Sequence, residues 1–174
     1  DAWRVNPEKI AVCGFSAGGH LAASLGVYYN ASYLQNVVGM KEGKNRPNAL
    51  ILCYPVISGE HFPHLGSYKN LLGENPSEKQ MFEMSLEKHV TSSTPPSFIW
   101  STFNDACVPV QNSLTFAYAL KSKSIPFELH IFPDGPHGLS LCNEQTANGN
   151  ERLINPQVSV WTRLCEQWLK FLAF

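Results

Sequence analysis

The stretch Gly14-Phe15-Ser16-Ala17-Gly18-Gly19-His20, GFSAGGH, joins two segments of different pattern. The apolar run from Lys9 to Gly14 follows the turn signal Asn6-Pro7, and it predicts a buried strand. Beyond the stretch, apolar side chains recur at helical spacing: Leu21, Ala22, Leu25, Tyr28 and Tyr29. Ser16 is therefore predicted to stand on a sharp corner between a strand and a helix.

This corner has the G-x-S-x-G pattern of a nucleophile elbow. Ser16 needs a strained backbone to project its hydroxyl, and Gly14 and Gly18 are expected to remove the side chains that would collide there. The start of a helix offers unpaired N–H groups and a positive dipole end, so the N–H of Ala17 is the predicted oxyanion donor. A tight glycine turn that serves packing or phosphate binding is the alternative reading of the motif.

The composition predicts one soluble globular domain over residues 1–174, with 44% hydrophobic and 16% charged residues. The formal net charge of -1 gives no electrostatic reason to expect nucleic acid or an anionic membrane as a partner. No apolar run approaches the roughly 18 residues of a transmembrane helix. The five cysteines include no C-x-x-C pair, which indicates reduced, buried thiols in a cytoplasmic protein.

Strand and helix signals alternate along the rest of the chain. Further strands are predicted within residues 49–57, 97–101 and 127–132. Helices are predicted from a capping box at Ser77 and Gln80 to about Lys88, over about 110–121, and from the cap Asn155-Pro156 onward, where one apolar stripe is expected to pack on the core (Trp161, Leu164, Cys165, Trp168, Leu169 and Leu172). Residues 58–76 show no clear period and predict a long, cap-like loop. The pattern indicates an α/β fold with a parallel sheet of about four strands and helices on both faces.

A nucleophilic serine needs a base, and the base needs an acid that orients it. Of six histidines, only His137 lies on a loop directly after the carboxyl end of a predicted strand, so it is the candidate base. Of the aspartates, Asp1 is terminal and Asp134 is expected to shape its own turn. Asp105 follows the neighbouring strand and is the candidate acid. The order Ser16, Asp105, His137 is that of an α/β-hydrolase.

Five segments together resemble the α/β-hydrolase superfamily, and more narrowly its acetyl-esterase or xylan-esterase-like branch. They are GFSAGGHLAASLG (Gly14 to Gly26), YPVISGE (Tyr54 to Glu60), PPSFIWST (Pro95 to Thr102), DACVPVQNSL (Asp105 to Leu114) and PFELHIFPDGPHGLSL (Pro126 to Leu141). The resemblance implies Ser16 as nucleophile, Asp105 as triad acid and His137 as base, with no cofactor. It implies hydrolysis of small acyl esters, acetyl esters above all, including esters of sugars. Asn104 departs from relatives that carry a second acid there, and little effect on the triad is expected.

One element of the resembling family has no counterpart in this sequence. Its members open with further strands and a His-Gly-Gly type loop that completes the oxyanion hole, whereas here the Gly-Gly pair lies in the elbow. The chain is thus expected to be a carboxyl-terminal portion of such an enzyme, weak or inactive alone, with the strand before Gly14 on an exposed sheet edge.

Three other readings stay open on the sequence alone. One is a serine peptidase of the prolyl-oligopeptidase type, which shares the fold and the triad. Another is a catalytically inactive α/β-hydrolase fragment. The third is a metal site at Glu60, His61 and His64, whose spacing matches no common zinc-binding motif. In the long loop, Phe62, His64 and Tyr68 are candidates to line an acyl or sugar pocket, with ordinary packing as the alternative.

Overall fold

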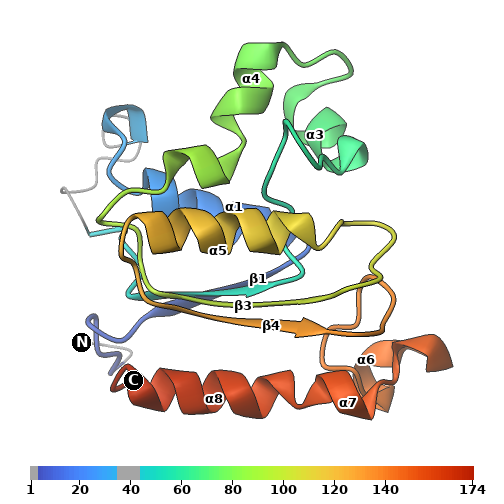
Figure 1. The fold of residues 1–174 in the computed structure, drawn as a ribbon. Coiled ribbons are helices and arrows are strands. Elements are labelled where there is room, and N and C mark those ends of the chain that lie inside the picture. Colours follow the sequence, from blue (N-terminus) through green and yellow to red (C-terminus); the bar gives the residue numbers. More distant parts are fainter. Residues whose placement is uncertain (1–3, 35–43) are drawn as a thin grey trace.

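A parallel sheet of four strands forms the centre of the computed structural model, which describes residues 4–34 and 44–174. The strands lie in the order β1 (Ala11–Phe15), β2 (Ala49–Cys53), β3 (Ser97–Thr102) and β4 (Phe127–Phe132). The prediction of a parallel α/β sheet of about four strands is confirmed. Because all four strands run in one direction, the loops that follow their carboxyl ends lie on the same side of the sheet (Figure 1).

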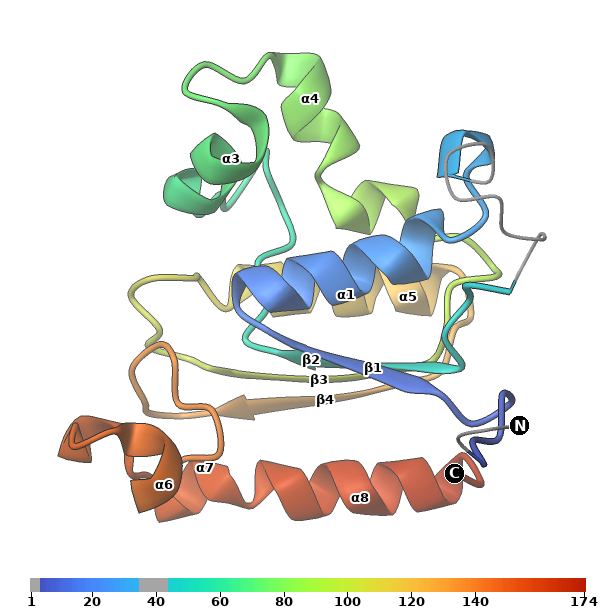
Figure 2. The same cartoon turned by 180° about the vertical axis from the view of Figure 1, so that it is seen from behind.

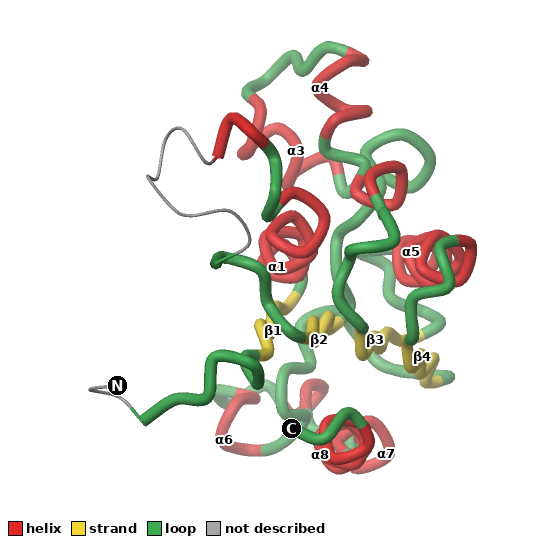
Figure 3. The backbone as a smooth tube through the Cα atoms, turned by 90° about the vertical axis from the view of Figure 1, so that its left-hand side faces the viewer, coloured by secondary structure: helices red, strands yellow, loops and turns green. Residues whose placement is uncertain are grey.

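Helices cover both faces of the sheet (Figures 1 and 2). One face carries α1 (Ala17–Tyr28) and α5 (Gln111–Ser122), and the other carries α7 (Pro156–Ser159) and α8 (Trp161–Phe171). The view along the strands in Figure 3 shows these two helical layers on opposite sides of the sheet. The prediction of helices on both faces is therefore also confirmed.

Side chains of β2 alternate between two hydrophobic cores. Leu50 and Leu52 belong to the core shared with α1 and α5, whereas Ile51 and Cys53 belong to the core shared with Trp168 of α8. All five residues of this strand are buried. Burial on both faces explains why the run shows little alternation in sequence. Each fully buried leucine contributes roughly 1.5–3 kcal/mol of transfer free energy.

The segment 58–76 contains a helix, so the prediction of a loop without regular structure is wrong there. Helix α3 (Leu65–Leu72) starts at His64, whose Nδ1 accepts a hydrogen bond from the N–H of Ser67 at 3.3 Å. Histidine is not among the usual N-cap residues, and this helix buries only Tyr68. The sequence thus carried neither a familiar cap nor an apolar stripe that would have indicated the helix.

Helix α4 (Glu78–Glu83) begins at the predicted capping box, since Ser77 and Gln80 bond each other's backbone N–H. It ends before the predicted Lys88, and the short helical turn η1 (Leu86–His89) follows. The hydroxyl of Ser85 donates to the carbonyl of Met81 and accepts from the N–H of Gly59 at 3.0 Å. These bonds tie the break between the two helical segments to the start of the 58–76 segment.

The predicted last helix is divided in two at Val160, which ends α7 and precedes α8. Asn155 caps its start as predicted, because its side chain accepts from the N–H groups of Gln157 and Val158. The predicted stripe packs against the second core, with Trp161, Cys165 and Trp168 buried. Two short segments that the sequence did not indicate, α6 (Glu144–Ala147) and η2 (Glu151–Leu153), connect β4 to this helix pair.

Strand β1 lies at one edge of the sheet, as expected. Ile10, directly before it, is 41% exposed. Cys13 on this strand and Cys107 are exposed, which corrects the prediction of five buried thiols, while Cys53, Cys142 and Cys165 are buried. All five lie in the described part of the chain, and none of them is joined in a disulfide. Across residues 4–34 and 44–174, no helix has the length and hydropathy that spanning a membrane requires.

Candidate active site

Ser16 occupies the corner between β1 and α1 in a conformation that few residues other than glycine adopt. Its backbone angles are φ 54° and ψ -120°. The N–H of Ser16 donates to the carbonyl of Cys53 at 3.0 Å, and its own carbonyl accepts from Val56 N–H at 3.1 Å. Because both partners belong to the end of β2 and the residues after it, the neighbouring strand holds the strained corner in place. The predicted strand-to-helix corner at Ser16 is confirmed.

The glycines around Ser16 have different roles from those predicted. A Cβ on Gly14 would lie 2.1 Å from the carbonyl oxygen of Gly18, so Gly14 is required for the close passage of strand and helix. A Cβ on Gly18 would meet nothing within 4 Å, so the prediction that Gly18 relieves a collision is wrong. Gly19 takes that part instead, because a Cβ there would lie 2.7 Å from Cβ of Pro55. The structural reason is that residue 18 faces outward on the first turn of α1, whereas residue 19 faces the chain after β2.

The three residues singled out in the sequence lie in one hydrogen-bonded chain. Ser16 Oγ is 2.7 Å from His137 Nε2, and His137 Nδ1 is 2.6 Å from Asp105 Oδ2. An ionised carboxylate can only accept, so Nδ1 carries the proton and donates it to Asp105. Nε2 is then the acceptor for the Ser16 hydroxyl. Asp134 does not take the place of Asp105, because its carboxylate accepts from the side-chain amide of Asn104; Asp1 lies outside the described residues.

Asp105 is buried, with 6% of its surface exposed, yet its oxygens are well supplied with donors. Oδ1 accepts from the N–H groups of Cys107 at 2.8 Å and Val108 at 2.9 Å, while Oδ2 accepts from His137. Burial alone raises the pKa of this carboxyl, but the hydrogen bonds from His137, Val108 and Cys107 together outweigh burial and lower the pKa. Asp105 therefore stays an anion that orients the imidazole of His137.

The loop that carries His137 is fastened on both sides. Asn104 accepts the N–H of Gly135 at 2.9 Å and donates its amide to Asp134, so the residue that departs from the resembling family ties the loop to the end of β3. Beyond His137, the hydroxyl of Tyr54 accepts from Ser140 N–H at 3.0 Å. The Tyr54 ring also packs edge-on against His137, with 5.0 Å between the ring centres.

Tyr54 is a positioning residue that sequence reasoning did not single out. It follows β2 directly and has a positive φ of 38°. A non-glycine residue with positive φ leaves no mark in the sequence, and an apolar run that ends in tyrosine reads as ordinary core.

The N–H of Ala17 stands at the N-terminal end of α1, next to Ser16. Among the described residues, no backbone carbonyl accepts from it, whereas the N–H groups of Gly19 and His20 turn back to the carbonyl of Ser16. An N–H in this place is suited to hold a negative oxygen, because the helix dipole adds to the hydrogen bond.

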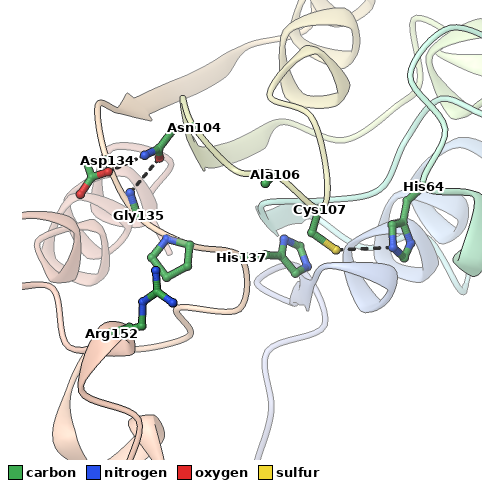
Figure 4. Close-up of a pocket in the computed structure, with 9 residues that line it drawn as sticks. His64, Asn104, Ala106, Cys107, Asp134, Gly135, His137 and Arg152 are labelled. Atoms are coloured by element: carbon green, nitrogen blue, oxygen red, sulfur yellow. Dashed lines mark hydrogen bonds between the residues drawn. The ribbon is translucent and has the colours of Figure 1, made fainter.

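One cavity is lined in part by His137 and another in part by Ala17, and Ser16 lines neither of them. The first, here the His137 cavity, has a volume of about 850 Å³, and Figure 4 shows its lining: His64, Asn104, Ala106, Cys107, Asp134, Gly135, Pro136, His137 and Arg152. The second, the Ala17 cavity, has about 400 Å³ and is lined by Ala17, His20, Leu21, Ser24, Val56, Ser67, Tyr68, Asn70, Leu71 and Met84. His137 belongs only to the first lining and Ala17 only to the second.

The aromatic and imidazole candidates of the 58–76 segment are separated by the fold. His64 lines the His137 cavity, where its Nε2 lies 3.4 Å from Cys107 Sγ. Since Nδ1 of His64 accepts from Ser67 N–H, Nε2 carries the ring proton. Tyr68 is buried and its hydroxyl donates to the carbonyls of Ile57 and Met84, although one side of it lines the Ala17 cavity. Phe62 lines neither cavity.

Glu60, His61 and His64 do not come together in the described structure. Glu60 pairs with Lys88 at 3.5 Å, and His64 bonds Ser67 and Cys107. Within residues 4–34 and 44–174, no three His, Cys, Asp or Glu side chains are grouped as metal ligands would be.

His20 is a buried histidine on the first turns of α1, which follow the corner at Ser16. Its Nε2 donates to the carbonyl of Met84 at 2.9 Å, and its ring meets that of Tyr68 edge-on. Burial lowers the pKa of His20, and the Met84 carbonyl offsets only part of that effect. The neutral ring thus joins α1 to the end of α4.

Residues 1–120 match the family described as BD-FAE. The chain belongs to the BD-FAE family. An endo-1,4-beta-xylanase B of Butyrivibrio fibrisolvens is 41% identical over 84% of this chain and 23% of its own length. An acetylxylan esterase of Xylanibacter ruminicola is 35% identical over 78% of this chain and 27% of its own length.

Among solved structures, an acetyl ester-xyloside bifunctional hydrolase from Caldicellulosiruptor lactoaceticus superposes with a TM-score of 0.83 and 45% identity. The match covers 98% of this chain and 59% of that one. This BD-FAE chain thus has an α/β-hydrolase fold. It spans about a quarter of the length of the two curated relatives, and about three fifths of that solved structure.

Proposed function

We propose that this BD-FAE chain belongs to a serine carboxylic ester hydrolase that cleaves small acyl esters, acetyl esters of sugars above all, through Ser16, His137 and Asp105. The observation that carries the proposal is the unbroken hydrogen-bonded chain of 2.7 Å and 2.6 Å from Ser16 Oγ through His137 to Asp105. An acetylxylan esterase and an acetyl ester-xyloside hydrolase among the relatives support the choice of acetyl and of a sugar alcohol.

In the first half of the reaction, Ser16 Oγ forms a bond to the ester carbonyl carbon while His137 Nε2 takes the hydroxyl proton. The carbonyl oxygen becomes an anion and accepts from Ala17 N–H. Asp105 stabilises the imidazolium that forms. As the tetrahedral intermediate collapses, Nε2–H gives its proton to the leaving alcohol and the acyl group stays on Ser16. In the second half, a water molecule gives a proton to His137 Nε2 and attacks the acyl carbon, and the free acid leaves as Ser16 Oγ takes the proton back.

The two cavities receive the two parts of the ester. The leaving oxygen must come within reach of His137 Nε2, so the alcohol occupies the His137 cavity. The carbonyl oxygen faces Ala17, so the acyl chain extends into the Ala17 cavity, where Leu21, Val56 and Leu71 offer apolar walls. At about 400 Å³ this cavity is larger than an acetyl group requires, and acyl chains slightly longer than acetyl also fit.

The test is labelling of the folded chain with a fluorophosphonate, followed by location of the adduct by mass spectrometry. We expect one adduct, on Ser16, and a burst of nitrophenol from nitrophenyl acetate that is lost in Ser16→Ala. Ser122→Ala is the matched control, because that hydroxyl is exposed on α5 and bonds only the carbonyl of Tyr118.

Each alternative outcome has a distinct meaning. An unchanged burst in Ser16→Ala would remove Ser16 from the mechanism. A folded wild-type chain that is neither labelled nor acylated would contradict the proposed activity for this chain. Cleavage of a peptide anilide without cleavage of an acetyl ester would replace the esterase by a peptidase.

A further inference from the structure

Arg152 is the one permanent cation among the residues that line the His137 cavity in the described structure. It lies on η2, a segment that the sequence did not indicate, and Figure 4 shows it on the opposite side of His137 from His64. The proposed ester hydrolysis does not require a positive charge at the position of Arg152. A cation in the lining of the proposed leaving-group cavity is suited to bind a negatively charged group of the substrate.

The backbone under Arg152 is fixed relative to His137. The side chain of Asn150 accepts from Arg152 N–H at 3.2 Å, and the amide of Asn155 donates to the carbonyl of Asp134 at 3.2 Å. This second bond ties the segment after Arg152 to the loop that carries His137. These bonds hold the backbone of Arg152 beside the cavity, while its side chain is exposed.

No acidic side chain of the described residues pairs with Arg152. The ion pairs there join other residues, and Asp134, the one carboxylate on the cavity wall, is engaged by the amide of Asn104 instead. Within this lining, Arg152 is therefore the side chain whose charge favours a negative group.

We propose that Arg152 is a specificity-determining residue that binds a carboxylate carried by the alcohol part of the ester, as in an acidic sugar. This rests on the proposed function, since it takes the His137 cavity as the leaving-group site. A guanidinium binds a planar carboxylate through two parallel N–H bonds, which a neutral alcohol cannot match. The residue touches the substrate at a distance from the reacting carbonyl, so its contribution is made equally in the bound state and in the transition state.

A pair of acetyl esters isolates this contact. In 4-acetoxybenzoate and its methyl ester, the acyl group and the ring are the same, and the leaving phenol carries a carboxylate in the first and a neutral methyl ester in the second. For each variant, kcat/KM for the anionic ester is divided by kcat/KM for the neutral one. We expect this ratio to fall about fivefold in Arg152→Gln, chiefly through KM, and to fall by a smaller factor in Arg152→Lys, which keeps the charge but not the two parallel N–H bonds. In the wild-type chain, added salt should lower the ratio as well.

Arg163→Gln is the control, because it removes the same charge from an exposed position on α8 outside the cavity. An equal fall in that variant would overturn the inference in favour of a long-range charge effect. The same ratio in wild type and Arg152→Gln, with Ser16 still acylated, would overturn it and leave the proposed function standing. If neither ester is cleaved in a Ser16-dependent way, the proposed function fails, and this inference with it.

Discussion

Substitution of Gly14 by alanine tests whether the strand-to-helix corner depends on close backbone passage. The new Cβ would lie 2.1 Å from the carbonyl oxygen of Gly18 and 2.6 Å from its carbonyl carbon, whereas real Cβ atoms essentially never come under 3.0 Å. The neighbour is backbone of the first turn of α1, so this turn would have to move by about 1 Å. We expect a loss of about 3 kcal/mol in the free energy of unfolding, or roughly 10 °C in Tm.

Gly18→Ala is the matched control, four residues away on the same corner. Its Cβ meets nothing within 4 Å, and alanine favours a helix over glycine by up to about 1 kcal/mol. Urea denaturation gives the free energies of unfolding, and the rate of fluorophosphonate labelling reports whether Ser16 is still presented to His137. Equal stability of Gly14→Ala and wild type, or equal damage in the two variants, would refute the account of the corner.

Four further predictions concern the acid, a buried histidine and the acyl site. Asp105→Asn removes the acceptor that selects the His137 tautomer, so kcat for nitrophenyl acetate should fall about 10⁴-fold; an unchanged kcat would exclude Asp105 from the triad. The pKa of Asp105 is lower in the folded chain than its ordinary value of 3.8. The ionised Asp105 therefore stabilises the fold fully above pH 3.8, and this contribution is lost as the pH falls through the lower folded pKa. In a series of Tm values against pH, Asp105→Asn should accordingly lose less Tm than wild type on the acid side. The pKa of His20 is also lowered in the folded chain, so below the ordinary value of 6.5 the unfolded chain binds the proton more readily and the free energy of unfolding should fall. His20→Gln should lose this pH dependence of stability. Urea denaturation above and below pH 6.5 measures the free energy of unfolding of both chains. Leu71→Trp narrows the Ala17 cavity and should lower kcat/KM for a butyryl ester relative to an acetyl ester by about tenfold; an unchanged ratio would place the acyl chain elsewhere.

The strands and the main helices could be predicted because their signals are local. β2 reads as an apolar run, and the caps at Ser77 and Asn155 form as expected. Helix α3 could not be predicted, since its cap is a histidine and it buries only Tyr68. The division at Val160 was also missed, because the apolar stripe continues on the same face after the break.

Within the site, too, the features with local sequence signals could be predicted, and those that depend on contacts between distant segments could not. Ser16, Asp105 and His137 were found by their places after predicted strands, since parallel strands must bring their carboxyl ends to one edge. The relief of crowding by Gly19 instead of Gly18 could not be found, because it depends on where Pro55 passes the helix. The support that Tyr54 gives to the His137 loop was missed for a similar reason, since its partner Ser140 is far away in the chain.

The sequence by itself determined the order of elements, the strand-to-helix corner at Ser16, and the three residues able to form an acid-base-nucleophile chain. These follow from side-chain periodicity, glycine and proline positions and the direction of parallel strands, all of which act over a few residues. Only the tertiary structure decided the distances within that chain, the lining of the two cavities and the place of Arg152 beside His137. Those features depend on packing and hydrogen bonds between segments far apart in the chain, and no local pattern records which distant atoms will meet.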